Sequence, residues 1–405
     1  MLNSLNRIPE NWEVVDFRNV AELKHGYQFR NYDFTDKGIK IFKITQIKGD
    51  GIADISSCSY IDINRIDEFK RVILNKGDIL IALTGATIGK VARFNFDEIV
   101  LQNYRVGNFI PLNENILNKE YFFQFLKSDF FFNQILANQT QSAQQNIGKE
   151  DINNMSVVLP PLPEQKAIAN ILSAIDAKIE NNLAINKTLE EMAMALYKEW
   201  FVDFGPFQDG KFIESELGLI PEGWVVANLE DLFVLQRGFD LPKKKRIEGN
   251  VPIYAASGKS TYHNEYKVEA PGVTTGRSGV LGNVYFVSED FWPLNTSLWI
   301  KEYRSSTPYH AFFVLKNIDL KEFNSGSAVP TLNRNDVHRI KVVKPEKSII
   351  NLFSVQIAKI FRKIEMNTQQ KQTLTQLRDT LLPKLVSGEV RLNEFDLEEV
   401  LEGEI

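Results

Sequence analysis

The sequence predicts an α+β protein in which two globular mixed α/β domains are separated by two long helices, with the helices forming an antiparallel coiled coil and the chain forming a pseudo-twofold internal repeat. Three observations support this. The segment that opens at Ile8 recurs at Ile220. A long stretch with helical periodicity follows each copy. Short segments of strand character fill the two blocks between them.

The internal repeat organises the chain. IPENWEVVDFRNVAELKHG begins at Ile8, and IPEGWVVANLEDLFVLQRG begins 212 positions later. Further matches bring the separation down to 185, so the second copy is 27 residues shorter inside. The later matches pair TGATIGKV at Thr84 with TGRSGVLGNV at Thr275, LQNYRVGNFIP at Leu101 with PLNTSLWIK at Pro293, and SAQQNIGKEDINNMSVVLP at Ser142 with SAVPTLNRNDVHRIKVVKP at Ser327. The copies share their flanking segments and differ in their central segments. This indicates one scaffold that carries two different functional regions. A duplication kept only for stability is the alternative.

Both blocks contain short segments rich in β-branched and aromatic residues, which predict strands. In the first block these segments are 12–17, 39–44, 78–83, 91–96, 103–110 and 155–160. In the second block they are 224–229, 251–256, 272–275, 283–287, 297–300 and 340–345. One aromatic-rich helix is expected in each block, over 121–135 and over 308–318.

The stretch from Glu164 to Phe201 lacks internal Pro and Gly and carries apolar residues at alternating steps of four and three, a heptad pattern. Its stripe is Ile168, Leu172, Ile175, Ile179, Asn182, Asn186, Leu189, Ala193, Leu196 and Trp200. The second copy repeats the stripe as Phe353, Ile357, Ile360, Ile364, Asn367, Lys371, Leu374, Arg378, Leu381 and Leu385. A helix of this length, about 55 Å, needs a partner for its apolar face.

The simplest partner for each long helix is the other one. The first helix carries the chain away from the first block, so the second must run back, which predicts an antiparallel pair. Buried Asn182 and Asn367 would fix its register at a cost in stability. We expect Lys371 and Arg378 to point at solvent or at another subunit. The alternative is that each helix is an ordinary core helix of a separate domain.

Composition excludes several classes of protein. The net charge is −5, no apolar run is long enough for a membrane span, and the first residues lack the apolar core of a signal peptide, so a cytoplasmic location is expected. One cysteine, Cys58, rules out an internal disulfide and a cysteine-based zinc site. The four histidines show no metal-ligand spacing. We find no GxGxxG, HExxH or GxSxG motif, so the chain is expected to be a reader or a scaffold and not a catalyst.

The segment TGATIGKV superficially matches a nucleotide-binding loop. A Walker A motif needs four residues between its glycines and Ser or Thr after Lys, whereas Gly85 and Gly89 enclose three and Val91 follows Lys90. A Gly/Thr-rich turn with a nearby cation can instead hold a DNA phosphate. A tight turn that simply requires glycine is the alternative.

We identify a resemblance to the specificity subunits of type I restriction-modification enzymes. Their central conserved region resembles LPPLPEQKAIANILSAIDAKIENNLAINKTLEEMAMALYKEWFVDF at Leu159, and the end of their distal region resembles TLLPKLVSGEVRL at Thr380. The starts of their target recognition domains look like IPENW and IPEGW, and a turn typical of those domains looks like GATIGKV. The second helix departs from the pattern, with KPEKSIINLF where the first has PPLPEQKAIANIL.

The resemblance covers essentially the whole chain and implies its organisation. Residues 1–160 would be target recognition domain 1, 161–205 the central long helix, 206–345 target recognition domain 2, and 346–405 the distal long helix with the C-terminal tail. Such subunits are non-catalytic and read a gapped, bipartite double-stranded DNA target. Two modification subunits dock along the helices and use S-adenosylmethionine, and two restriction subunits add ATP- and Mg-dependent cleavage. This chain would itself hold no cofactor or metal.

Base readout requires Arg, Lys, Asn or Gln at the base edges in the major groove, and residues that differ between the copies are the best candidates. In the first block they are Thr84, Thr87, Lys90, Arg93, Gln102 and Arg105. In the second block they are Lys243, Lys244, Lys245, Arg246, Arg277, Ser278 and Arg334. For the lysine run, phosphate contact is favoured over base reading, and a solvated loop is the alternative.

Two other functions remain open. The chain is equally compatible with the specificity subunit of a two-subunit gapped-site restriction system whose partner is a fused nuclease–methyltransferase. A structural or interaction protein organised around the long helices, without a role on DNA, is the other.

Overall fold

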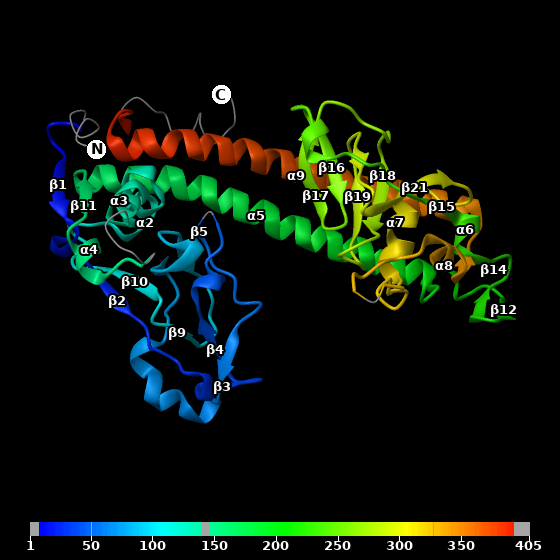
Figure 1. Ribbon diagram of the computed structural model, residues 1–405, viewed down its shortest axis with the longest axis horizontal. Coiled ribbons are helices and arrows are strands. Elements are labelled where there is room, and N and C mark those ends of the chain that lie inside the picture. Colours follow the sequence, from blue (N-terminus) through cyan, green and yellow to red (C-terminus); the bar gives the residue numbers. More distant parts are fainter. Residues whose placement is uncertain (1–7, 50, 140–145, 327, 393–405) are drawn as a thin grey trace. The chain divides into compact units, whose positions relative to one another are not determined.

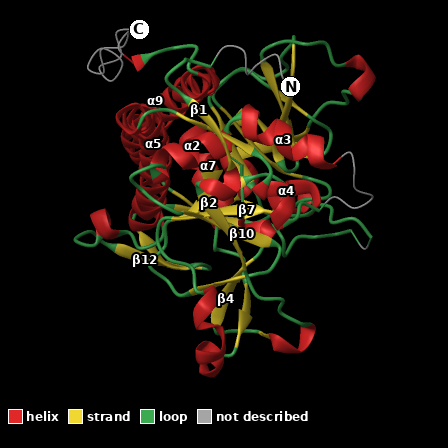
Figure 2. Cartoon of the chain, turned by 90° about the vertical axis from the view of Figure 1, so that its left-hand side faces the viewer, coloured by secondary structure: helices red, strands yellow, loops and turns green. Residues whose placement is uncertain are grey.

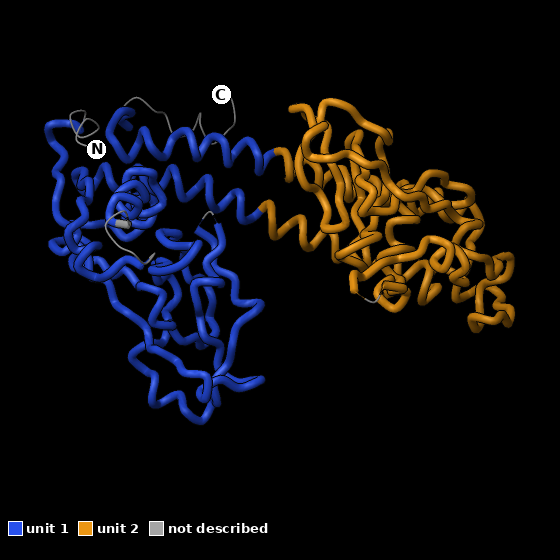
Figure 3. The backbone as a smooth tube through the Cα atoms, in the orientation of Figure 1, with its two compact units in different colours: residues 1–181, 370–405 blue, residues 182–369 orange. Residues whose placement is uncertain are grey.

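The computed structural model describes residues 8–49, 51–139, 146–326 and 328–392. The chain divides into unit 1, residues 1–181 with 370–405, and unit 2, residues 182–369 (Figure 3). The border between them falls inside both long helices, α5 (Leu162–Phe201) and α9 (Lys347–Ser387). The start of the repeat match at Ser142 and Ser327 lies outside the described residues.

Unit 1 is built, among its described residues, on a five-stranded sheet in the order β2-β10-β7-β8-β5 and a four-stranded sheet in the order β3-β6-β4-β9. The larger sheet contains β2 (Ala21–His25), β10 (Val106–Pro111), β7 (Asp78–Ala82), β8 (Val91–Phe94) and β5 (Gly51–Ile52). The smaller one contains β3 (Phe34–Thr35), β6 (Ser59–Ile61), β4 (Ile39–Phe42) and β9 (Val100–Gln102). Every pairing is antiparallel except β5 with β8 and β4 with β9.

Unit 2 is built, in the part that the structure describes, on a four-stranded sheet in the order β15-β21-β18-β19 and a three-stranded sheet in the order β17-β16-β20. The larger sheet contains β15 (Phe233–Arg237), β21 (Ser297–Tyr303), β18 (Gly272–Gly276) and β19 (Val284–Val287). The smaller one contains β17 (Gly258–His263), β16 (Val251–Ala255) and β20 (Trp292–Pro293). A hairpin of β12 (Phe212–Ser215) and β13 (Gly218–Pro221) precedes both sheets in the chain.

A two-stranded antiparallel ladder links the start and the end of each block. In unit 1 it joins β1 (Glu13–Asp16) to β11 (Ser156–Leu159), with Glu13 opposite Leu159. In unit 2 it joins β14 (Val225–Asn228) to β22 (Lys341–Lys344), with Val225 opposite Lys344. Shifting Glu13 by 212 and Leu159 by 185 gives this second pair. The two separations read from the sequence therefore describe the same register in both ladders.

The larger sheets also share one plan. The order β2-β10-β7-β8 in unit 1 has the same sequence of connections as β15-β21-β18-β19 in unit 2. In the smaller sheets, β4 pairs antiparallel with β6 and parallel with β9, and β16 likewise pairs antiparallel with β17 and parallel with β20. Every segment predicted to be a strand contains one, so the mixed α/β class is confirmed.

The aromatic segment of unit 1 forms two helices, not the single one predicted over 121–135. They are α2 (Lys119–Lys127) and α3 (Asp129–Gln139), followed later by the short α4 (Lys149–Asn153). Ser128 separates α2 from α3, with an extended backbone at φ −73° and ψ 153°. Its hydroxyl donates to the Phe125 carbonyl oxygen at 2.6 Å and accepts from the Phe131 amide, which ends one helix and begins the next.

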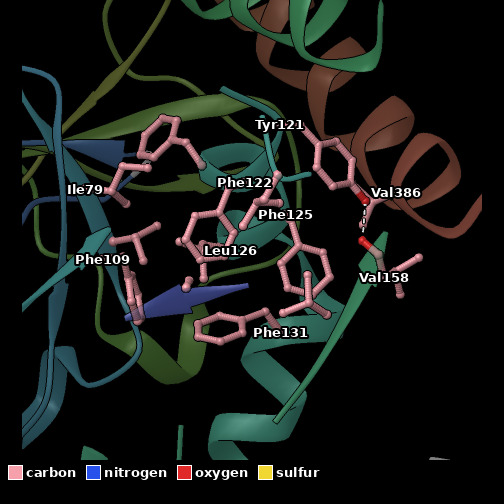
Figure 4. Close-up of a cluster of buried hydrophobic side chains, with 14 of the residues drawn as sticks. Ile79, Phe109, Tyr121, Phe122, Phe125, Leu126, Phe131, Val158 and Val386 are labelled. Atoms are coloured by element: carbon pink, nitrogen blue, oxygen red, sulfur yellow. Dashed lines mark hydrogen bonds between the residues drawn. The ribbon is translucent and has the colours of Figure 1, made fainter. Parts of the chain in front are cut away.

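The core of unit 1 lies between its larger sheet and these helices (Figure 4). Phe109 from the sheet contacts Phe122 of α2 and Phe131 of α3, with ring centroids 5.8 and 6.2 Å apart. Tyr121 is fully buried, and its hydroxyl donates to the Val158 carbonyl oxygen at 2.8 Å. These contacts hold α2 against the ladder that precedes α5.

The core of unit 2 is completed by the long helices. The predicted helix over 308–318 is present as α7 (Pro308–Asn317), and the unit also contains the short helices α6 (Leu229–Leu232) and α8 (Arg334–His338). Tyr197 of α5 stacks on Phe313 of α7, with centroids 5.6 Å apart. Phe353 of α9 lies 4.9 Å from Phe201 of α5. Most of the phenylalanines therefore serve the core.

The long helices run antiparallel inside each unit and lie beside each other in both views (Figure 1, Figure 2). In unit 1, Glu164 near the start of α5 pairs with Arg391, just beyond α9. In unit 2, Asn186 bonds to Asn367, and further along α5, Tyr197 meets Phe353 at 6.2 Å. Within each unit, higher residue numbers on α5 therefore lie beside lower residue numbers on α9, as in an antiparallel pair.

The expectation for Arg378 is wrong. Its side chain is 5% exposed and pairs with Asp176 of α5, so it does not point at solvent. No sequence pattern indicates this contact, because Asp176 lies off the apolar stripe. Asn182 and Asn367 are buried as expected, and Lys371 is half-buried.

Candidate functional site

The loops at one edge of each larger sheet carry most of the candidate residues. In unit 1, β2 ends at this edge, β7 ends there and β10 begins there, because each of these strands is antiparallel to its neighbour. The loops 26–30, 83–90 and 103–105 therefore meet, and we call them rim 1. In unit 2, the loops 238–246, 277–283 and 294–296 meet in the same way and form rim 2.

The glycine that closes each copy of the opening segment shapes its rim. A Cβ on Gly26 would lie 2.2 Å from the carbonyl oxygen of Gln102, and one on Gly238 would lie 2.2 Å from that of Leu294. The next residues, Tyr27 and Phe239, donate their amides to the same neighbouring strand ends at 2.9 and 2.8 Å. Only glycine permits this approach of two backbones, which explains its recurrence.

The Gly/Thr turn corrects one match made in the sequence. Thr84 forms an isolated β-bridge with Asn146, and Ser278 forms one with Thr331. Thr331 lies 185 positions after Asn146, which is the separation of the two copies at this end of the repeat. The structural counterpart of Thr84 is therefore Ser278 and not Thr275. Thr275 is instead part of strand β18, so the second turn begins three residues later than the letters suggest.

Both turns depend on glycines with left-handed backbones. They are Gly85 and Gly89 in rim 1, at φ 74° and 78°, and Gly279 and Gly282 in rim 2, at φ 91° and 89°. Glycine adopts this conformation without a steric penalty. The tight-turn interpretation of TGATIGKV thus holds, whether or not the turn also binds a phosphate.

Rim 1 presents polar groups with spare hydrogen-bonding capacity. The hydroxyl oxygens of Thr84 and Thr87 are buried, and neither has a hydrogen-bond partner among the residues that the structure describes. Lys90 is exposed at the end of the same turn. Arg105 is exposed, and its Nε donates to the Tyr104 hydroxyl at 2.8 Å. The rim therefore combines cations, hydroxyls and an aromatic ring.

Two candidate DNA-binding residues of the first block, Gln102 and Arg93, have side chains that are engaged in contacts within the fold. Gln102 is 4% exposed, and its Nε2 donates to the carbonyl oxygens of Lys24 and Val106 at 3.0 and 2.8 Å. Arg93 lies on β8, where its guanidinium pairs with Glu120 of α2. These contacts give both side chains a role in the fold.

Rim 2 is richer in positive charge. The lysines Lys243, Lys244 and Lys245 are exposed on the 3-10 turn η7, which consists of these three residues. Arg246 is partly held, because its Nη1 donates to the Thr261 hydroxyl at 3.0 Å. These cations form the strongest basic cluster in the rim.

Arg277 and Ser278 begin the rim 2 loop that follows β18. The Nε of Arg277 donates to the Asn295 carbonyl oxygen at 2.8 Å. Burial, followed by the nearby charge of Arg237, lowers the pKa of Arg277. The Leu332 amide donates to the Arg277 carbonyl oxygen at 2.8 Å, which brings the loop leading to Arg334 against the rim. Arg334 itself is exposed at the start of α8.

The structure adds residues directly next to rim 1 that the sequence did not single out. The 3-10 turn η2 (Asn31–Asp33) follows β2 as η7 follows β15, and a shift of 212 carries one onto the other. Tyr32 on this turn is 84% exposed. Its neighbour Asp33 is buried and accepts from Arg65 at 2.8 Å, which fixes the turn. Applying the repeat to the lysine run would have found these residues.

Residues 8–49, 51–139, 146–326 and 328–392 contain neither a candidate metal site nor a candidate membrane span. No group of three or more His, Cys, Asp or Glu side chains is arranged to hold a metal ion. No helix there combines the length and apolar character needed to cross a membrane.

Comparisons with known proteins agree with this arrangement. A family model described as "Type I restriction modification DNA specificity domain" matches residues 9–191 and 221–377. The chain is similar to the specificity subunit of type I restriction enzyme MjaIX of Methanocaldococcus jannaschii, with 26% identity over 96% of each chain. It is also similar to that of HindI of Haemophilus influenzae, with 24% identity over 82% of this chain and 91% of the relative.

A solved structure has the same fold. The crystal structure of the S subunit of a type I restriction-modification system from M. genitalium superposes with a TM-score of 0.58. The superposition covers 94% of this chain and 96% of the other, at 18% identity. At that level of identity the likeness concerns the fold alone.

Proposed function

The chain belongs to the type I restriction modification DNA specificity family, and from this premise we propose that it is the non-catalytic subunit that selects the DNA sequence for a type I restriction-modification complex. One observation carries the proposal. The family match falls in two separate stretches, and each stretch contains one rim and parts of the long helices. A protein with two such rims is suited to a target with two parts.

The proposed organisation has two target recognition domains, residues 1–160 and 206–345. They are joined by the central long helix within 161–205 and by the distal long helix, which with the C-terminal tail makes up 346–405. The helices form an antiparallel coiled coil, and the two halves are related by a pseudo-twofold axis. Antiparallel packing inside each unit supports the coiled coil. The equal strand orders and ladder registers of the two units support the repeat.

The proposed target is a gapped, bipartite duplex. Each rim reads one half, and the two rims carry different side chains, so the half-sites differ. On rim 1 the proposed contacts are the exposed Lys90 and Arg105, together with the Thr84 and Thr87 hydroxyls, which are buried in the free chain. Arg93 and Gln102 are better explained as supports for the fold. On rim 2 the lysine run binds DNA phosphates, and Arg277, Ser278 and Arg334 lie beside a groove of the DNA.

The proposed partners follow from the role. Two modification subunits dock along the helices and carry S-adenosylmethionine for adenine methylation. Two restriction subunits carry ATP and Mg for translocation and cleavage. The complex acts in the cytoplasm, and this chain contributes selection of the site without a cofactor of its own.

Methylome sequencing tests the proposal. The full chain is expressed with the modification subunit encoded beside it, and modified adenines are mapped. We expect one motif made of two different half-sites with a fixed gap. A chain with Thr84→Ala and Thr87→Ala should alter only one half of that motif. Methylation without a consensus, or with an ungapped one, would contradict the proposal.

A further inference from the structure

The side chains that join the sheet-bearing part of each unit to the long helices differ in kind. In unit 1, α2 lies beside α5 (Figure 1), and a charged docking site joins β8, α2, α5 and α9. It consists of Arg93, Glu120, Gln124, Lys127, Asp176 and Arg378. In unit 2, β19 and α7 face the helices through an aromatic docking site. It consists of Phe286, Tyr309, Phe313, Lys316, Phe361 and Ala193.

The helix caps show that α2 and α7 are equivalent. The Asn118 side chain accepts from the backbone amide three residues on, and so begins α2. The Thr307 side chain does the same for α7. Glu120 and Tyr309 are each the second residue after their cap. The helices therefore correspond position by position.

Strand pairing shows that β8 and β19 are equivalent. Arg93 lies opposite Ile79, and Phe286 lies opposite Val273, on corresponding strands of the larger sheets. On the long helices the separation of 185 applies, as it does in the ladders before them. The equivalent positions are Arg93 and Phe286, Glu120 and Tyr309, Gln124 and Phe313, Lys127 and Lys316, Asp176 and Phe361, and Arg378 and Ala193.

The charged docking site is centred on Asp176 of α5. Its Oδ2 accepts from Lys127 Nζ at 2.7 Å and from Gln124 Nε2 at 2.9 Å. Its Oδ1 accepts from Arg378 Nη1 at 3.3 Å. The side chains of Lys127 and Arg378 are 7% and 5% exposed, and that of Asp176 is 18% exposed. One carboxylate thus joins α2 to both long helices with little access for water.

A ring extends this network to the sheet. The Arg93 guanidinium lies 4.3 Å from the centroid of Phe123 on α2, and Lys127 Nζ lies 5.3 Å from the same centroid. Arg93 also pairs with Glu120. Cations over an aromatic face are attracted by it, more so when water is excluded. The charged contacts therefore run from β8 through α2 to α5 and α9.

The aromatic docking site is centred on Phe361 of α9, at the position equivalent to Asp176. Its ring centroid lies 4.6 Å from that of Phe286 and 5.6 Å from that of Tyr309. Phe286 and Tyr309 stack at 4.9 Å, in place of the Arg93–Glu120 ion pair. The ring of Phe313 lies 6.1 Å from Phe361.

The two equivalent lysines show the effect of this difference. Lys127 is drawn into the charged docking site by Asp176. Lys316 remains exposed, with its Nζ 5.2 Å from the Phe312 ring and Phe361 where Asp176 would be. The same residue type at the same position is thus buried in one unit and solvated in the other.

From these contacts we propose that the two docking sites determine which domain occupies which position on the helices, and that the two domains cannot exchange places. Moving the first domain to the second position would bury Lys127 and Gln124 against Phe361 without a carboxylate. Moving the second domain to the first position would cover Asp176 and Arg378 with rings. A buried charge that loses its partner is strongly destabilising, so each mismatch excludes the wrong domain.

The decisive experiment places the first domain at both positions of the full chain. The segment 225–344 is replaced by 13–159, so that the exchanged parts begin and end at equivalent ladder strands. Hydrogen–deuterium exchange of residues 353–361 then reports docking on α9. We expect exchange there to rise by at least about tenfold, and Phe361→Asp with Ala193→Arg to restore protection.

Two outcomes would overturn the proposal. One is normal protection at the second position without the two substitutions. The other is a lack of protection that the two substitutions fail to repair. Neither readout involves DNA, so this result stands apart from the test of sequence selection.

The equivalent lysines provide a second test that does not require domain exchange. In the full chain, Lys127→Met should raise exchange in residues 172–181 by at least about tenfold, because Asp176 loses the nearer of its two cations and keeps only Arg378, at 3.3 Å. Lys316→Met is the matched control and should change exchange in 353–361 by less than about twofold. Adding Asp176→Leu and Arg378→Leu to Lys127→Met should recover protection, because no charge of the cluster then stays buried without its partner. Equal effects of the two lysine changes would contradict the proposal.

Discussion

Asn367 of α9 donates its Nδ2 hydrogen to the Oδ1 of Asn186 on α5 at 2.8 Å, and the Asn186 amide in turn donates to the Ile364 carbonyl oxygen at 3.2 Å. The two side chains satisfy each other only in this register, because a slip of one residue along either helix separates them. Polar pairs of this kind select one alignment of two apolar stripes.

The first prediction concerns this pair. Asn367→Ala should lower the free energy of unfolding by about 1–3 kcal/mol, because it removes a donor to a partly buried acceptor. Urea unfolding of the full chain followed by circular dichroism measures it. Gln372→Ala, at an exposed position on the same helix, is the control and should stay within about 0.5 kcal/mol of the unaltered chain. Equal stability of the two variants would show that the pair does not hold the helices.

The second prediction is a pH dependence that arises from His310. Burial lowers the pKa of this imidazole from its ordinary 6.5 to about 3, and its contacts are the Ser306 hydroxyl at 2.8 Å and the rings of Phe201, Tyr197 and Phe353. The folded form therefore holds the neutral ring, while the unfolded form binds a proton below 6.5. Stability is full above 6.5 and is lost as the pH falls toward the folded value.

The size of this loss is measurable. Between about pH 7 and pH 5 the chain should lose about 2 kcal/mol through His310 alone. His338 acts in the same direction, since burial lowers its pKa as well. Urea unfolding at the two pH values provides the measurement. His310→Phe should reduce the loss, whereas His25→Asn, on an exposed side chain, should not; the same loss in all three chains would contradict the assignment.

The sequence predicts the ladders and the central strands of the sheets better than it predicts strand β2 and the helix break at Ser128. The strands of the ladders and sheet centres follow from β-branched and aromatic runs. Strand β2, with Glu22 and Lys24 among its five residues, has no such run and exists because β10 offers it a partner. The break at Ser128 depends on which carbonyl its hydroxyl reaches, and that is fixed by packing.

The candidate site could be predicted in part for a related reason. A comparison of the copies finds turns and charges, which include Thr84, Arg277 and the lysine run. It cannot separate a cation that faces solvent from one that faces a neighbouring helix. Arg93 and Arg378 have ion-pair partners 27 and 202 residues away, respectively, and no local pattern indicates such contacts.

The third prediction concerns the close approach of two backbones at rim 1. Gly26→Ala should lower the free energy of unfolding by about 2–4 kcal/mol, because the new methyl group would overlap the Gln102 carbonyl and β2 must move away from β9. Gly49→Ala is the control, since no atom lies within 4 Å of a Cβ there. Thermal unfolding compares the two. If Gly26→Ala is as stable as its control, the glycine does not fix the rim.

The fourth prediction separates phosphate contact from base reading on rim 2. Lys243, Lys244 and Lys245 are exposed and adjacent, as expected for side chains that neutralise a DNA backbone. Replacing all three by Gln should weaken binding to every duplex and reduce the slope of log K against log salt by up to about three. The measurement is a salt titration of the assembled complex on its methylated motif and on an unrelated duplex.

The control and the contradictory results follow from the same electrostatics. Lys211→Gln removes one exposed positive charge away from rim 2 and should leave the slope unchanged, which separates a local contact from an effect of net charge. An unchanged slope in the triple variant would show that the run is a solvated loop. A selective loss on the motif, with binding to the unrelated duplex intact, would show instead that these lysines read bases. Because counterion release depends on the number of phosphates neutralised and not on their sequence, a parallel fall on both duplexes is the result that places the run on the DNA backbone.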